Sequence, residues 1–248
     1  MKGKNKIIVL SVFILLFLWK AASILVGYSF ILPGPEQVFV AMIALLQDLS
    51  FYEAVIATAL RSIFGLSLAF LSAFGFAYFA WKHTWFANVF SPVLLLMRSV
   101  PNISYILLIL YWCSRNSSSI IISFLILFPM IYQTLYEALK ELQRSYLNVL
   151  KIYPKKMKES ILQVYLPLLR PAISASICNG IAMSFKVGVM AEILGQVGTG
   201  VGRQMQLARL NFDLVTVMAW TGWIILLLFV SDQILKRLLA VLCRGEVS

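Results

Sequence analysis

The sequence predicts an all-α integral membrane protein with six transmembrane helices, on two observations. The 248 residues are 61% hydrophobic and only 12% charged, with a mean hydropathy of +0.89. A soluble domain could not cover so many apolar side chains with polar surface. The chain also contains six windows that are long and apolar enough to cross about 30 Å of hydrocarbon, namely residues 7–26, 54–80, 86–112, 119–136, 171–191 and 213–239. We interpret residues 1–248 as a single transmembrane domain.

The first window follows three lysines, Lys2, Lys4 and Lys6. Such a start also fits a signal peptide that is cleaved near the "KAAS" stretch at Lys20. We favour an uncleaved span, because cleavage would leave five spans and place the C-terminus outside, against the charge pattern. Lys20 itself lies near the outer end of the window, where its ammonium group can reach water.

The second, fourth, fifth and sixth windows are each continuous, but the third is interrupted. Arg98 and Pro101 fall inside it, and proline cannot continue a helix without losing a backbone hydrogen bond. The window is therefore expected to consist of a re-entrant piece followed by a shorter helix that starts near Asn102.

The distribution of positive charge predicts that both termini are cytoplasmic. With the N-terminus inside, two thirds of the 21 Lys and Arg residues fall in cytoplasmic segments, and only Arg115, Arg203 and Arg209 fall in external loops. The formal charge of +11 would suggest nucleic acid as a partner of a soluble protein, but membrane orientation explains it here. We expect a multi-pass protein of the inner, or cytoplasmic, membrane.

A basic cytoplasmic loop, residues 137–170, is expected between the fourth and fifth windows. Its apolar residues recur at three- and four-residue spacing up to Tyr153, which predicts a short helix. Pro154 ends that helix, and a second helix can run from Pro154 to about Tyr165 before Pro167 interrupts the chain. Two helices joined at a proline predict a rigid elbow. The alternative is an ordinary positive loop held at anionic lipid.

The elbow resembles the cytoplasmic loop of the permease subunits of binding-protein-dependent ABC importers. In that family the loop reads Glu-Ala-Ala, three residues, Gly, nine residues, Ile, any residue, Leu-Pro. The same frame is filled here by Asn148-Val149-Leu150, three residues, Pro154, nine residues, and Val164-Tyr165-Leu166-Pro167. Asn148 thus replaces the acid of the family pattern, Pro154 replaces the glycine, and Leu-Pro is retained.

Four further stretches resemble, in the same order, the subfamily that imports sulfonates, taurine and nitrate. They are "LPGPEQVFVAMIALLQD" from Leu32, "TALRSIFGLSLAF" from Thr58, "SPVLLLMRSVP" from Ser91 and "MAEILGQVGTGVG" from Met190. The resemblance therefore extends over nearly the whole chain.

The resemblance implies a type I importer permease fold and a set of partners. Such permeases act in pairs, and a homodimer is expected here. Each elbow docks on one of two ATPase subunits, which bind ATP and Mg, and an external binding protein delivers the solute. This chain has no GxxxxGK[ST] loop to hold phosphate, so we expect no enzymatic activity and no bound cofactor or metal in it. The residues expected to couple to the ATPase are Leu147, Asn148, Val149, Leu150, Lys151, Pro154, Leu166 and Pro167.

Polar residues inside the fifth window are candidates for the solute path, because such residues are costly in lipid. Ser176, Asn179, Met183, Lys186 and Met190 recur at three- and four-residue spacing and are expected on one helix face. Helix packing is the alternative role for the serine and the asparagine. A lysine deep in a span needs water, an acid or an anionic ligand.

Two further charged residues complete the candidate path, Arg98 and Glu192. Arg98 either lines the path or marks the break in the third window. Glu192 lies six residues after Lys186, which places it on a different helix face, so a direct pair between the two is not expected. Arg61, near the outer end of the second window, is interpreted as reaching water.

Cations near a path would suit a small anion such as a sulfonate, taurine or nitrate. In the same architecture, a pyrimidine vitamin precursor or another small nitrogenous nutrient is the alternative cargo. A stand-alone secondary transporter is a further alternative, but it would normally show more spans and an internal repeat. No cluster of His, Cys or carboxylate residues in the sequence marks a catalytic site.

Overall fold

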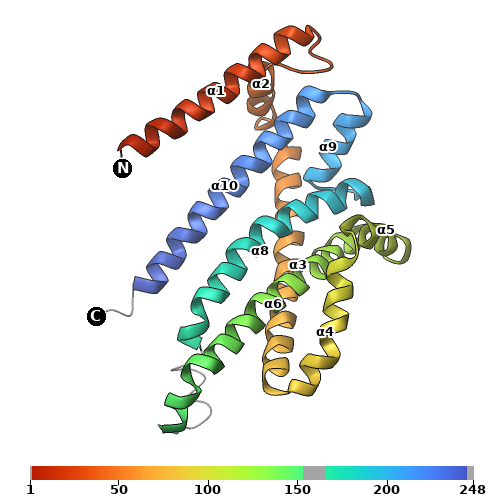
Figure 1. Cartoon of the computed structure of the whole chain (residues 1–248). Helices are drawn as coiled ribbons and strands as arrows, with labels where there is room; N and C mark the ends of the chain where they lie inside the picture. Colours follow the sequence, from red (N-terminus) through yellow and green to blue (C-terminus); the bar gives the residue numbers. More distant parts are fainter. Residues whose placement is uncertain (1, 153–165, 245–248) are drawn as a thin grey trace.

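The fold is built from long α-helices (Figure 1). The structure is a computed structural model that describes residues 2–152 and 166–244. In these two segments the helices are α1 (Lys2–Val26), α2 (Pro35–Leu45), α3 (Leu49–Lys82), α4 (Thr84–Ser99), α5 (Asn102–Trp112), α6 (Arg115–Ile152), α8 (Leu166–Gly195), α9 (Val201–Leu210) and α10 (Leu214–Arg244).

Three long helices, α3, α6 and α8, form the centre of the bundle (Figure 1). The packed face of α3 carries small side chains at three- and four-residue spacing, among them Ala69, Ala73 and Ala77, which are completely buried. Small residues let helix backbones approach closely, which is how helices associate when lipid removes the hydrophobic drive between them. The packed face of α3 therefore allows α6 and α8 to approach it closely.

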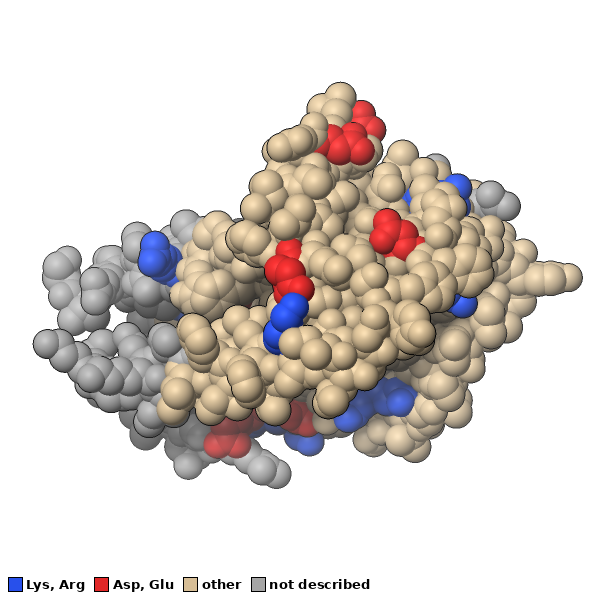
Figure 2. Space-filling view, turned by 90° about the horizontal axis from the view of Figure 1, so that it is seen from above, with Lys and Arg blue, Asp and Glu red and all other residues tan. Residues whose placement is uncertain are grey.

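Large apolar side chains face away from this centre. On α3 itself Leu60, Phe64 and Leu71 are more than 60% exposed, and Figure 2 shows uncharged residues over most of the described surface seen from above. An exposed apolar surface of this extent needs lipid or another chain to cover it. On α3, mainly small side chains face the centre and large ones face outward, a pattern that fits a membrane-embedded bundle.

The break predicted in the third window is confirmed. Helix α4 ends at Ser99, α5 begins at Asn102, and the two axes differ by 95°. Val100 is extended at φ −73° and ψ 127°, because the residue before a proline disfavours the helical region. The bend leaves Arg98 on the last turn of α4.

Helix α6 is longer than the fourth window predicted. Residues 137–152, expected in the loop, continue the same helix. The reason is amphipathic packing, since Leu135, Leu139 and Leu142 are buried at four- and three-residue spacing against a cluster that includes Leu169 of α8. The first helix of the predicted elbow is therefore the end of α6 rather than a separate element.

The join between α1 and α2 is held by polar contacts. Trp19 Nε1 donates to Pro33 O at 3.0 Å, and Ser23 Oγ donates to Leu32 O at 3.0 Å. Lys20 forms an ion pair with Glu36, and this hydrogen bond is the main reason that the pKa of the Glu36 carboxyl lies below its usual value. These contacts orient α2 under the end of α1.

Four helices of the described segments are long and apolar enough to cross a membrane, and the bent α4–α5 pair makes a fifth if it counts as one span. The four contain the second, fourth, fifth and, except for Asp213, sixth predicted windows. The first window, residues 7–26, lies within α1, whose apolar stretch with described side chains is Leu10–Val26. Multi-pass membrane embedding follows from these helices.

Candidate functional site

A polar cleft of about 450 Å³ opens between α4, α5, α6 and α8. Arg98 enters it from the bend after α4, and Met183 enters it from α8. Arg98 lies about 21 Å of helix rise from the start of α4, so the cleft is near the middle of the bundle. Two residues that the sequence marked separately thus line one cavity. Among the other lining residues are Asn102, Tyr105, Ile126, Met130, Gln133, Thr134 and Glu137.

The charged groups of the cleft form one chain of hydrogen bonds. The Arg98 guanidinium donates to the side-chain oxygen of Gln133, and Gln133 Nε2 donates to Glu137 Oε1 at 2.6 Å. The side-chain amide of Gln133 thus links the Arg98 guanidinium to the Glu137 carboxylate through two hydrogen bonds. Arg98 is exposed to the cleft, so its remaining N–H donors can reach an anion there.

Four of the five residues that were predicted to share one face of α8 are exposed. Asn179, Met183, Lys186 and Met190 are all exposed and lie at four- and three-residue spacing, while the rest of the helix around them is largely buried. Ser176 differs, because it is 3% exposed and its Oγ has no hydrogen-bond partner among the described residues. Its assignment to the shared face was wrong.

Glu192 lies in a second polar site, at whose centre its side chain is buried. Its carboxylate is fully buried and accepts hydrogen bonds from Thr58 Oγ1 at 2.8 Å, Arg61 Nη1 at 2.9 Å and Gly202 N at 3.0 Å. Arg61 Nη1 also donates to Thr199 O at 2.6 Å. We call Thr58, Arg61, Glu192, Thr199 and Gly202 the Glu192 cluster.

The cluster attaches the start of α9 to α3 and α8. A helix begins with N–H groups that lack partners inside the helix, and Gly200, which precedes α9, supplies no side-chain cap. Glu192 accepts from Gly202 N instead, and Thr58 Oγ1 accepts from Val201 N at 2.9 Å. The positive end of the α9 dipole also favours the carboxylate.

Two glycines make this contact possible. Gly200 has φ 140°, which side chains rarely adopt. At Gly202 a Cβ would lie 2.5 Å from Val189 O and 2.6 Å from Glu192 Cβ, so no larger residue fits without displacing α8. The Gly-Val-Gly stretch from Gly200 is thus required by the close approach of α9 to Glu192.

Two sequence interpretations are corrected by this geometry. Arg61 was expected to reach water, but its guanidinium lies against the buried Glu192 carboxylate and its side chain is 15% exposed. Glu192 was placed among residues of the path, but it lies away from the exposed face of α8. The expectation that Lys186 and Glu192 do not pair is confirmed, since Glu192 pairs with Arg61.

Of the residues expected to couple to an ATPase, those that are described lie where α6 ends and α8 begins (Figure 1). Glu192 lies near the other end of α8. Leu147, Asn148, Val149, Leu150 and Lys151 lie near the end of α6, and their side chains fall outside the described part. Pro154 lies outside the described residues. Leu166 begins α8 and Pro167 is its second residue, a position where the missing N–H of proline costs nothing.

Metal binding finds no support in the described residues, where no three His, Cys, Asp or Glu side chains are placed to hold one ion. The polar side chains of the two sites make hydrogen bonds and one ion pair. The cleft can bind a polar solute reversibly, whereas the Glu192 cluster has its groups already paired. Apolar helices around a polar, mid-bundle cleft are the architecture of a multi-pass membrane transport protein.

Comparison with known proteins specifies this class. Residues 65–240 match the family described as binding-protein-dependent transport system inner membrane component, and the chain belongs to this family. It is similar to a probable ABC transporter permease protein of Haemophilus influenzae, at 23% identity over 82% of this chain and 83% of the relative. A probable ABC transporter permease protein of Brucella melitensis is also 23% identical, over 83% of this chain and 84% of the relative.

The chain is thus a transmembrane permease subunit of an ABC transporter, a transport subunit and not an enzyme. Permeases of this family generally work with ATPase and binding-protein partners. The sequence reasoning found Arg98 and Met183 of the cleft but missed Gln133 and Glu137. These two lie four residues apart, just where the fourth window ends, and this spacing puts both on one helix face.

Proposed function

We propose that the chain forms the solute path of an ATP-driven importer for a small anion of the sulfonate, taurine or nitrate type. The observation that carries the proposal is the mid-bundle cleft with Arg98 at its wall. A guanidinium can form two parallel hydrogen bonds with an oxyanion, and these are stronger than neutral ones. Lys186, on the exposed face of α8 that also carries Met183, adds a second positive charge near the route.

The proposed assembly contains two permease copies, two ATPase subunits and an external binding protein. The sequence carries no phosphate-binding loop, so ATP and Mg would bind on the ATPase. In the proposed topology, six spans cross the inner membrane and both termini lie in the cytoplasm, in agreement with the positive-inside pattern. The end of α6, from Leu147 to Lys151, together with Pro154, Leu166 and Pro167, would dock on the ATPase.

A second cargo class is favoured by one observation, the acid in the same cleft. Glu137 Oε1 already accepts from Gln133 Nε2, and its other oxygen could accept from an amine or a ring N–H. A small nitrogenous nutrient, such as a pyrimidine vitamin precursor, would use Glu137 more than Arg98. The two cargo classes therefore predict opposite rankings of two substitutions.

Arg98→Gln is expected to lower ATP-driven uptake of a small sulfonate or nitrate about tenfold or more, because a charge-assisted hydrogen bond contributes about 1.5–3 kcal/mol. Glu137→Gln should do much less. Arg203→Gln, on α9 and away from the cleft, is the matched control. Uptake is measured in proteoliposomes that also contain the ATPase, and co-purification with the ATPase checks assembly. The reverse ranking, with Glu137→Gln the more damaging, would favour the nitrogenous cargo.

Lys186→Met is expected to lower transport while leaving co-purification with the ATPase unchanged, because the side chain is exposed on α8. Lys82→Met, at the exposed end of α3, serves as the control. Poor expression or lost assembly of the Lys186 variant would instead indicate a packing role. Unchanged transport in a well-assembled variant would remove Lys186 from the path.

A further inference from the structure

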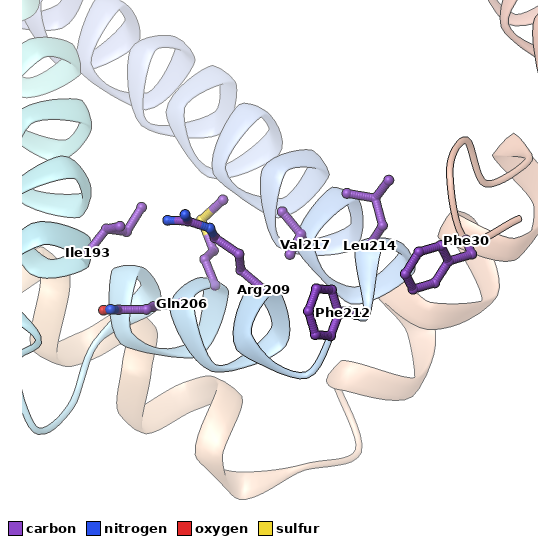
Figure 3. Close-up of a pocket in the computed structure, with 8 residues that line it drawn as sticks. Phe30, Ile193, Gln206, Arg209, Phe212, Leu214 and Val217 are labelled. Carbon is purple, nitrogen blue, oxygen red and sulfur yellow. The ribbon is translucent and has the colours of Figure 1, made fainter.

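A cavity of about 470 Å³ lies where α8 ends and α10 begins (Figure 3). It shares no lining residue with the Arg98 cleft. Its walls come from α8, α9, α10 and the segment after α1. Apolar side chains make most of the lining, including Ile193, Val217 and Leu214. The volume and the apolar lining with few polar groups are typical of small-molecule sites.

Two polar groups enter this lining from α9, Arg209 and Gln206 (Figure 3). Among the described residues, no acid forms an ion pair with Arg209. Gln206 Oε1 is buried and has no hydrogen-bond partner in the described part of the chain. A buried acceptor without a donor is costly, and an arginine beside apolar walls favours an anion. The cavity thus offers a cation and an unsatisfied acceptor to one ligand.

The aromatic edge of the cavity is held in an unusual backbone conformation. Phe212 has φ 56°, in the left-handed region that bulky residues rarely occupy. Backbone hydrogen bonds fix this turn, with Phe212 N donating to Arg209 O at 3.1 Å and Asp213 N donating to Ala208 O at 2.9 Å. The Phe212 ring lies 6.2 Å from that of Phe30. Strain held in this way is often found at ligand sites.

We propose that this cavity binds an amphiphile with a phosphate-type head that also carries a hydrogen-bond donor. The oxyanion would pair with Arg209, the donor would reach Gln206 Oε1, and the apolar tail would lie between Phe30, Phe212 and the side chains of α8 and α10. The spanning helix α8 ends beside the cavity and the spanning helix α10 begins beside it. The cavity would therefore lie at the level of the lipid headgroups. A membrane phospholipid and a water-soluble amphiphile share this chemistry.

The test measures binding to the full chain in a neutral detergent by native mass spectrometry. The probes are phosphatidylglycerol, decyl phosphate and glycerol 3-phosphate, which has the head but no tail. Arg209→Gln is expected to weaken binding of the tailed probes about tenfold or more, because it removes a charge-assisted contact. Val217→Trp, which fills the cavity without changing charge, should also weaken it. Arg203→Gln on the same helix should leave binding unchanged.

The occupant follows from the order of affinities. Tighter binding of phosphatidylglycerol identifies a membrane lipid, and tighter binding of decyl phosphate identifies a soluble amphiphile. Equal effects of Arg209→Gln and Arg203→Gln, or equal binding of glycerol 3-phosphate and the tailed probes, would overturn the proposal. The assay needs no ATPase and no transported solute, so its outcome is independent of the proposed import function.

Discussion

Glu192→Gln is expected to lower the free energy of unfolding by about 3–5 kcal/mol, the usual cost of removing one partner from a buried ion pair. Arg61 would then keep its charge beside a neutral amide inside the bundle, and Gly202 N would lose its carboxylate acceptor. Arg61→Met should cost a similar amount, because it leaves the fully buried Glu192 carboxylate without a counter-charge. These are the largest stability effects that the fold predicts for single conservative changes.

A double-mutant cycle separates this pair from general packing. The combined Arg61→Met and Glu192→Gln variant should be about as stable as either single variant, since each change removes the group that the other leaves unpaired. Unfolding is followed by titration with a denaturing detergent in mixed micelles. Glu53→Gln, at an exposed position on α3, is the control for removing an acid elsewhere. Additive losses in the double variant would show that the two side chains act independently, against the observed contact.

Leu150→Asp is expected to reduce ATP-driven uptake at least tenfold, either by uncoupling hydrolysis or by releasing the ATPase. An unpaired charge in a closed apolar contact is strongly destabilising, and the resemblance of this loop to the family pattern predicts that Leu150 makes such a contact with the ATPase. Asn148→Ala, two residues away, removes only a neutral hydrogen bond and should do less. ATPase co-purification and uptake are measured together for both variants.

Normal assembly and normal uptake with Leu150→Asp would contradict this account of the segment. The frame through Asn148, Pro154 and Leu166 would then be misaligned. A loss confined to uptake, with the ATPase still bound, would locate the defect in coupling rather than in docking.

The parts of the fold that could be predicted are those set by local chemistry. Apolar length predicted the long helices, and Pro101 predicted the bend before Asn102. The end of α6 was missed because hydrophobicity averaged over a window falls after Tyr136, while burial continues on one face through Leu139 and Leu142. The helical periodicity of the apolar residues continues there, but a hydrophobicity average over a window does not detect it.

The two polar sites depend on contacts between segments that are distant in the sequence. Individual residues of these sites could be predicted from the sequence, but their contacts could not. The stretches from Thr58 and from Met190 were both singled out, but their junction through Arg61 and Glu192 joins residues 131 apart. Lys186 and Glu192 could be separated by helical phase, whereas the partner of Glu192 could not be named. Ser176 was misplaced because three-residue spacing puts it near the face of Asn179, whereas its side chain is buried. Spacing along one helix does not show which neighbouring helix covers a side chain.

Reconstitution tests the central claim, that this chain is the solute-conducting subunit of an ATP-driven importer, most directly. The chain is placed in proteoliposomes with and without its ATPase and binding protein, and uptake of labelled sulfonate, nitrate and pyrimidine solutes is measured. The account predicts uptake that requires ATP, the ATPase and the binding protein, and that falls with Arg98→Gln or Glu137→Gln according to the cargo. Robust uptake by the chain alone, driven only by an ion gradient, would contradict it.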